Sequence, residues 1–448
     1  MLVFAFITSA LALVTVMISK YIALNILPSP IEAKAIKHKS SHHFSSLPSA
    51  RRGNISPFFS QPNIANPGSC INYNPYMRTI TVSCSSAKLT DIDNRIHDSN
   101  ILSKQSLAGI WLLNANIVIA KEATFHIDST DTKWLKIVSD QAIAPVPYNI
   151  DVRGSLKIDS VKITSWDPTT NNYAISNGSR EAVPLGTKGA TPNGYIIHYG
   201  APRGFIKIEH DATRTTDITN SEIAYLGYES GISDIGSGGL NYYGANGSVI
   251  RGNYIHDLYF GFYSSGVGYM TIENNQVYHN ANYGLDPHTG THDMIIRNNI
   301  VHDNGAQGII CSLNCYNVLI ENNQIYNNGA AGIMFSRNMS NSIARNNIIF
   351  NEVKGIFISQ SHYNKIYNNT ISDSQYGINV VFGSSGNTFY SNVIKNSQHG
   401  IESQDTTSNK SENTFYNNQF INSHSVISRH NNKPSFDIAK NRGVRSNF

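Results

Sequence analysis

Three side chains that can take part in proton transfer stand within six residues of one another near the middle of the chain. Tyr283, Asp286 and His288 belong to the segment Tyr-Gly-Leu-Asp-Pro-His. A neutral imidazole suits a general base, a carboxyl group can orient it or hold a sugar hydroxyl, and a phenol can return a proton. Such a set can remove and return the proton on a carbon beside a carboxylate, provided that a cation offsets the developing charge.

The segment lies in a repeat of about 23 residues. Each copy has a glycine, then apolar, variable and apolar residues, and usually a serine. In the copy that starts at Gly284 the serine is replaced by His288. A position that departs from its repeat is a candidate for chemistry. The glycines that begin the copies are Gly261, Gly284, Gly308, Gly332, Gly355, Gly377 and Gly400.

Asparagine gives the repeat a second landmark, with copies 22 to 26 residues apart. Between these positions apolar residues alternate with other residues over short runs bounded by Asn and Gly, which is typical of short strands. Stacked Asn side chains can bond from coil to coil. The sequence therefore predicts an all-β chain, a right-handed parallel β-helix with coils of about 23 residues and a small N-terminal cap. The asparagines are Asn253, Asn275, Asn299, Asn323, Asn347, Asn369, Asn392 and Asn418.

Alternation along the strands predicts which side chains face outward. The residues on either side of Asp286 share the parity of the apolar ladder, so Asp286 and His288 should face outward, roughly 7 Å apart. The neighbouring coils should place Tyr263 beside Asp286, and Ser265 and Ser312 on either side of His288. We therefore expect Tyr263, Asp286 and His288 to form a patch on one outer sheet.

Composition agrees with a solenoid. The chain of 448 residues is 40% hydrophobic, which is enough for a large core, but only 14% of its residues are charged. This composition suits a solenoid whose outer face consists mainly of Asn, Ser, Thr and Tyr. Its formal net charge is +4, and its basic residues are scattered apart from a short C-terminal tail. With no nucleic-acid-binding motif, we do not expect a nucleic-acid partner.

The chain divides into five predicted segments. Residues 1–27 are mostly apolar, with Lys20 between two apolar stretches, and predict an export signal or a membrane anchor. Residues 28–67 predict a flexible linker. Residues 68–106 should form the cap, 107–428 the catalytic β-helix, and 429–448 a basic tail. We expect an exported monomer located outside the cell, in the periplasm or at the cell surface, with the N-terminal segment either cleaved or retained as an anchor.

Four cysteines admit three pairings, and we expect the local ones. Cys70 and Cys84 flank a strand-like stretch and could staple the cap in an oxidising compartment. Cys311 and Cys315 lie within one coil, where a local disulfide or two buried thiols are favoured over a zinc site. A zinc site is disfavoured because no second close pair has metal-ligand spacing. No cofactor and no catalytic metal are expected.

The segment 283–288 resembles the active-site region of mannuronan C5-epimerases, and is closest to the periplasmic alginate-epimerase type with its Asp-Pro-His motif. Residues 259–263 in the preceding coil and residues 295–299 after the motif support the resemblance, as do 163–167 and 226–228 upstream. The likeness covers roughly residues 150 to 400. It implies a right-handed β-helix that acts on an anionic polysaccharide.

The resemblance also implies roles for individual residues. The motif histidine, taken as the catalytic base in this family, maps to His288, and the motif Asp and Tyr map to Asp286 and Tyr283. The family places an arginine after the serine of the next coil, where this chain has Leu313. Arg337 occupies the corresponding position one further coil along, about 4.8 Å away. The substrate-binding residues that we expect are Tyr263, Arg337 and Ser312.

We therefore expect a C5-epimerase that acts on a polymeric uronate. A polysaccharide lyase would share the proton abstraction but expel the neighbouring glycosidic oxygen. Lyases on this scaffold commonly use calcium and acidic clusters, and no dense Asp cluster adjoins His288. A non-catalytic, carbohydrate-binding β-helix is the second alternative, and the missing family arginine is the best argument for it.

Overall fold

The structure is a computed structural model that describes residues 69–139, 147–183, 187–190, 195–231, 237–404, 413–423, 425–430 and 442–444. Within these ranges nearly all regular structure is β-strand, and α2 (Leu89–Ile96) is a helix of eight residues. One compact unit comprises residues 70–179 and 198–448. The other includes residues 180–197, where the structure describes most of a two-stranded sheet formed by β13 (Ser179–Ala182) and β14 (Tyr195–His198).

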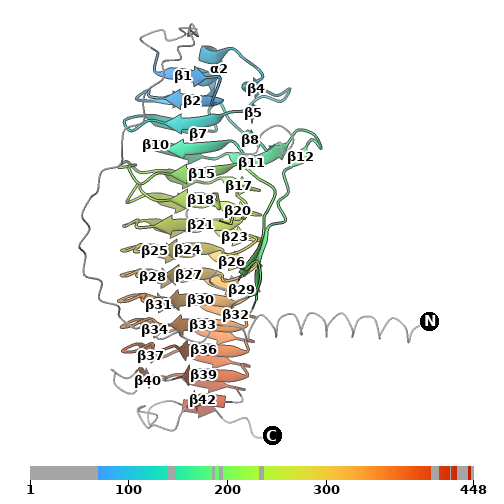
Figure 1. Ribbon diagram of the computed structural model, residues 1–448. Helices are drawn as coiled ribbons and strands as arrows, with labels where there is room; N and C mark the ends of the chain where they lie inside the picture. Colours follow the sequence, from blue (N-terminus) through green and yellow to red (C-terminus); the bar gives the residue numbers. More distant parts are fainter. Residues whose placement is uncertain are drawn as a thin grey trace, which may run out of the picture. The chain divides into compact units, whose positions relative to one another are not determined.

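The first unit is a parallel β-solenoid, because successive coils contribute successive strands to each of three long sheets (Figure 1). Sheet A contains the predicted site. In the described part of the chain its strands follow the order β1 (Ile71–Asn74), β2 (Thr79–Val82), β6 (Asn116–Ile119), β9 (Asn149–Val152), β15 (Phe205–Ile208), β18 (Gly239–Tyr242), β21 (Phe260–Ser265), β24 (Leu285–His288), β27 (Ile309–Ser312), β30 (Ala331–Ser336), β33 (Lys354–Ser359), β36 (Tyr376–Val381), β39 (His399–Gln404) and β42 (Ser425–His430).

Sheet B carries the second strand of each coil. Its described strands are β3 (Ala87–Lys88), β7 (Thr124–Asp128), β10 (Ser155–Asp159), β16 (Asp217–Thr219), β19 (Val249–Arg251), β22 (Thr271–Glu273), β25 (Ile295–Arg297), β28 (Leu319–Glu321), β31 (Ile343–Arg345), β34 (Lys365–Tyr367), β37 (Thr388–Tyr390) and β40 (Thr414–Tyr416).

Sheet C carries the third strand of each coil. Its described strands are β4 (Leu102–Lys104), β5 (Ile110–Leu113), β8 (Trp134–Val138), β11 (Lys162–Asp167), β17 (Glu222–Ala224), β20 (Tyr254–His256), β23 (Gln276–Tyr278), β26 (Ile300–His302), β29 (Gln324–Tyr326), β32 (Ile348–Phe350), β35 (Thr370–Ser372), β38 (Val393–Lys395), β41 (Gln419–Ile421) and β43 (Arg442–Val444), with β12 (Asn172–Tyr173) paired to β11.

Asparagine holds the coils in register, as the repeat predicts. The side chain of Asn299 donates from Nδ2 to Oδ1 of Asn323 at 3.0 Å, and Asn323 donates in the same way to Asn347 at 3.0 Å. The same ladder runs from Asn253 to Asn418, with coil lengths of 22 to 26 residues. These side chains are buried, so the ladder satisfies amide groups that would otherwise lack water.

The residue before several of these asparagines is a second Asn, and it makes the turn. Asn274, Asn298, Asn322, Asn346 and Asn368 have φ between 54° and 57°. This left-handed conformation is unfavourable for most residues but is tolerated by Asn. The Asn-Asn pairs therefore serve two purposes, since the first residue turns the chain and the second enters the ladder.

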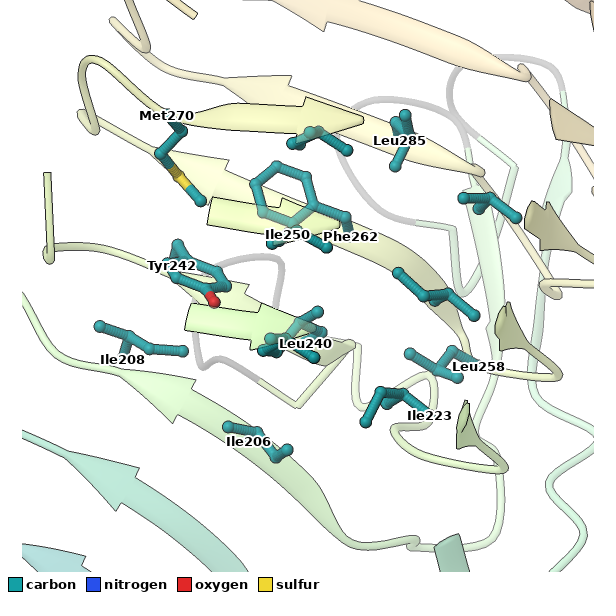
Figure 2. Packing of buried hydrophobic residues seen from close by; sticks show 14 of the residues in the cluster. Ile206, Ile208, Ile223, Leu240, Tyr242, Ile250, Leu258, Phe262, Met270 and Leu285 are labelled. Atoms are coloured by element: carbon teal, nitrogen blue, oxygen red, sulfur yellow. The ribbon is translucent and has the colours of Figure 1, made fainter. Parts of the chain in front are cut away.

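The repeated glycines are required by close approach between coils. A Cβ atom on Gly284 would meet the carbonyl oxygen of Gly308 at 2.5 Å, and one on Gly355 would meet Cγ2 of Ile371 at 2.4 Å. Inside the coils, stacked apolar side chains fill one continuous core. Figure 2 shows Tyr242 and Phe262 lying among aliphatic residues, where their rings are 5.5 Å apart. The Tyr242 hydroxyl donates to the carbonyl of Thr216 at 3.0 Å, so even this buried polar group is satisfied.

The first described coil forms the cap. β1 and β2 pair antiparallel, and the Cys70–Cys84 disulfide confirms the first predicted pairing. The alternative of a second local disulfide is wrong, because Cys311 and Cys315 are free thiols, both fully buried. Cys311 belongs to the core row of β27, as its parity predicts, and the Cys315 thiol donates to the carbonyl of Ser312 at 3.0 Å.

Several predicted segments lie wholly or partly outside the described residues. Residues 1–67, predicted as a signal or anchor followed by a linker, are outside them. The predicted tail contributes β43, which pairs parallel with β41. In the part of the chain that the structure describes, no helix is long and apolar enough to cross a bilayer.

The asparagine ladder gives a stability prediction. Asn323→Ala leaves the backbone N–H and Nδ2 of Asn299 and the carbonyl of Ile296 without their partner, so we expect the free energy of unfolding to fall by about 3 kcal/mol. Urea denaturation followed by circular dichroism measures this loss. The control is Gln324→Ala at the adjacent exposed position, which should change stability by less than about 0.5 kcal/mol. Equal stability of the two variants would contradict the structural role of the ladder.

Candidate active site

Register between coils brings the predicted residues together, as alternation and coil length predict. β24 lies between β21 and β27, with Tyr263 opposite Asp286 and Ser265 opposite His288. On the other side Ser312 lies opposite His288, and Ser336 follows in the next coil. The predicted neighbours of His288 are therefore confirmed.

His288 is half-buried at the end of β24 and makes contacts through both ring nitrogens. Its Nδ1 atom lies 2.6 Å from Oγ1 of Thr289 and 3.5 Å from the hydroxyl of Tyr263. Its Nε2 atom lies 3.1 Å from Nη2 of Arg337. The ring is thus held between a phenol and a guanidinium.

Arg337 reaches His288 from two coils away. It follows β30 in a turn with φ 51°, and Leu313 makes the equivalent turn one coil earlier with φ 58°. Because Ser312 is small, the Arg337 side chain can extend back across it, and Nε donates to Oγ of Ser312 at 2.8 Å. Arg337 therefore places a cation beside the imidazole although the position expected to hold one is Leu313.

These contacts favour one tautomer of the imidazole. A guanidinium N–H can only donate, so Nε2 of His288 must accept the hydrogen bond from Arg337. The proton of a neutral ring then lies on Nδ1, where the Thr289 hydroxyl can accept it. In the neutral ring, the lone pair of Nε2 is directed toward the Arg337 guanidinium.

The burial of Asp286 differs from what the sequence predicts. It was expected to project outward with His288, but it is only 2% exposed, and its neighbour Tyr263 on the outer side of sheet A is only 4% exposed. Within the described part of the chain, Oδ1 of Asp286 has no hydrogen-bond partner. Burial raises the pKa of the Asp286 carboxyl well above its usual range, although the charge of Arg337 opposes this shift. Burial therefore disfavours the charged form of this carboxyl group.

The two phenols take different places. Tyr283 precedes β24, five residues from His288, which is about 16 Å in an extended chain. Its ring stacks on Phe260, with centroids 5.5 Å apart. Tyr263, predicted as a substrate-binding residue and as one of two phenols that could return the proton, has its hydroxyl 3.5 Å from Nδ1 of His288.

Sequence reasoning missed Thr289. The Thr289 hydroxyl lies closer to Nδ1 of His288 than the Tyr263 hydroxyl does. The hydroxyl of Thr291, two residues further on, donates to the carbonyl of His288 at 2.8 Å. The available signal was weak, because it consisted only of two threonines after the motif in a chain rich in Ser and Thr. The turn that brings these hydroxyl groups back to His288 includes Thr289 and Gly290, both with positive φ.

The fold resembles several solved structures. The periplasmic alginate epimerase AlgG aligns with a TM-score of 0.67 and 20% sequence identity, covering 82% of this chain and 85% of AlgG. The A-module of the mannuronan C-5 epimerase AlgE4 from Azotobacter vinelandii aligns with a TM-score of 0.53 and 15% identity, covering 75% of this chain and 90% of the module. At these identities the likeness establishes the shared parallel β-solenoid.

Comparison by sequence adds the family. No curated protein sequence matches the chain. A family model described as periplasmic copper-binding protein (NosD) matches residues 211–410 and 314–445, which together span more than half of the chain and include His288 and Arg337. The protein therefore belongs to this NosD family.

Proposed function

We propose that the protein is a C5-epimerase of a polymeric uronate and that His288 is its catalytic base. The observation that carries the proposal is the 3.1 Å contact between Nη2 of Arg337 and Nε2 of His288 on the outer side of sheet A. A base and a cation at this separation match a substrate whose reacting carbon adjoins its own carboxylate. The resemblance of the solenoid to AlgG and AlgE4, both described as epimerases, supports the same activity.

The first step uses the contact between Arg337 and His288. A uronate carboxylate that pairs with the guanidinium takes over its N–H groups and frees the Nε2 lone pair. His288 then removes the proton from C5, and the C–H electrons pass into the carboxylate to form an enolate. Arg337 offsets the second negative charge that develops on the carboxylate oxygens. Ser312 holds Nε of Arg337 and so fixes the direction of the guanidinium.

The second step returns a proton to the opposite face of C5. We assign this donation to the Tyr263 hydroxyl, the phenol beside the imidazole. The phenolate that remains recovers a proton from Nδ1 of protonated His288, and exchange with solvent restores the starting tautomer. Burial raises the pKa of the Asp286 carboxyl, which disfavours a negative charge that would oppose formation of the enolate.

Copper, which the family description names, does not fit the described residues. In the ranges that the structure describes, no three side chains of His, Cys, Asp or Glu come together as metal ligands. Copper sites in proteins are built mainly from thiolate, thioether and imidazole donors. Burial raises the pKa of Cys315 to about 12 and that of Cys311 well above its usual value, so neither forms a thiolate readily. No step of the proposed reaction passes through copper.

We also propose that the protein acts outside the cytoplasm. The Cys70–Cys84 disulfide is typical of an oxidising compartment. AlgG and the NosD family are both described as periplasmic. An extracytoplasmic site also brings the enzyme to an exported polysaccharide.

Removal of the base tests the proposal. We expect His288→Asn to lower the rate of C5 inversion in polymannuronate by about 10²–10⁴-fold, the usual contribution of a general base. Proton nuclear magnetic resonance of the polymer measures the inverted sugars. The matched control is His279→Asn, an exposed turn residue with φ 53°, which should keep full activity. A folded His288→Asn enzyme with an unchanged rate would exclude His288 as the base.

Arg337 gives a second prediction. Arg337→Gln removes the cation that offsets the enolate charge, so kcat/KM should fall by about 10²–10³-fold, whereas Arg337→Lys should recover part of the loss. Arg251→Gln, at an exposed arginine of sheet B, serves as the control and should leave kcat/KM unchanged. If Arg337→Gln retains full kcat/KM, another residue neutralises the carboxylate.

The buried carboxyl predicts a pH dependence of stability. Below about pH 4 Asp286 is protonated in both the folded and the unfolded chain, so its full contribution to the free energy of unfolding is present. As the pH rises, the unfolded chain ionises Asp286 first, and stability falls by up to about 1.4 kcal/mol per pH unit until the raised folded pKa is reached. Asp286→Asn should therefore be more stable than the wild type at pH 7 and equally stable near pH 3, as measured by urea unfolding. A constant difference across this range would contradict a raised pKa.

A further inference from the structure

A second cation lies on the outer side of sheet A, away from His288. Lys354 begins β33, and its Nζ atom lies 3.9 Å from the ring centroid of Phe357. In the described residues this amine has no ion pair or hydrogen bond. Burial lowers the pKa of Lys354 to about 8, and the charge of Glu402 opposes the shift. A half-buried ammonium group without an anionic partner within bonding distance can bind a carboxylate.

The position of Lys354 follows from register. Ile310, Met334 and Phe357 are aligned in successive strands, one coil after another, and Asp286 holds the corresponding place in β24. The Lys354 amine lies over Phe357 and is therefore three coils beyond Asp286, about 14 Å along the solenoid. A polymer that extends along sheet A from His288 would pass this point.

The surroundings of Lys354 suit a sugar ring. Buried Phe357, Ala331 and Val381 form an apolar cluster separate from the core, and the partly exposed side chains of Met334 and Phe382 pack against it. Lys354 pairs in register with Tyr376, whose ring stacks on His399 at 4.7 Å. Apolar and aromatic side chains beside one cation can hold both the apolar face of a sugar and its carboxylate.

We infer that Lys354 and Phe357 form a second uronate subsite, which binds the carboxylate of a sugar several units away from the one that reacts at His288. This inference rests on the proposed function, because it assumes that the substrate is a uronate polymer. The subsite would favour long chains over short ones, since only a chain that spans the three coils reaches both cations.

Binding to an inactive variant tests the subsite separately from catalysis. In the His288→Asn background we expect Lys354→Met to weaken the binding of long polymannuronate by about 10-fold. Methionine keeps an apolar chain over Phe357 and removes only the charge, and Lys354→Arg should restore affinity. Binding of a mannuronate disaccharide, too short to reach from His288 to Lys354, should be unchanged. Isothermal titration calorimetry provides the dissociation constants.

The control is Lys365→Met in the next strand, β34, where the lysine is exposed on sheet B. It should leave the affinity for long polymannuronate unaltered. If Lys354→Met in the His288→Asn background leaves the affinity for long polymannuronate unchanged, the subsite is overturned, even if the wild type epimerises the polymer. Lys354-dependent binding without epimerisation by the wild type would retain the subsite and remove the proposed reaction. Failure to bind any uronate polymer would overturn both.

Discussion

Strict register between parallel coils is the constraint on which the site depends. The buried asparagine ladder and the glycines in contact with the next coil permit little displacement, because a shifted coil would leave amide groups unpaired or force side chains into the backbone. Residues far apart in sequence, such as Tyr263, His288 and Ser312, therefore meet in fixed positions on the outer side of sheet A. The repeat that stabilises the solenoid thus also sets the geometry of the candidate site.

Within this frame, the cation beside His288 comes from two coils away, in the coil where the sequence predicts Arg337 as a candidate. The turn after β27 carries Leu313, and the equivalent turn after β30 carries Arg337, which extends across Ser312 to His288. The small serine of the repeat makes room for this side chain. The cation therefore originates one coil further along the solenoid than the position at which the resemblance places it.

Periodicity predicted the solenoid, its core and the neighbours of His288, because all three depend on spacing and parity that are visible in the sequence. It did not predict the burial of Asp286, since parity indicates the side of a sheet but not how deeply neighbours such as Tyr263 cover a residue. Nor could cysteine spacing alone distinguish a disulfide between Cys311 and Cys315 from two thiols. The reach of Arg337 depends on side-chain conformation, so the sequence indicated it only as a candidate.

Incubation of the wild-type protein with polymannuronate in deuterated water would show whether this outer patch inverts C5 of a uronate by moving a proton. We expect deuterium at C5 of sugars with inverted configuration, detected by nuclear magnetic resonance and mass spectrometry. Unsaturated chain ends that absorb ultraviolet light, or a polymer that binds but acquires neither deuterium nor inverted sugars, would contradict this expectation.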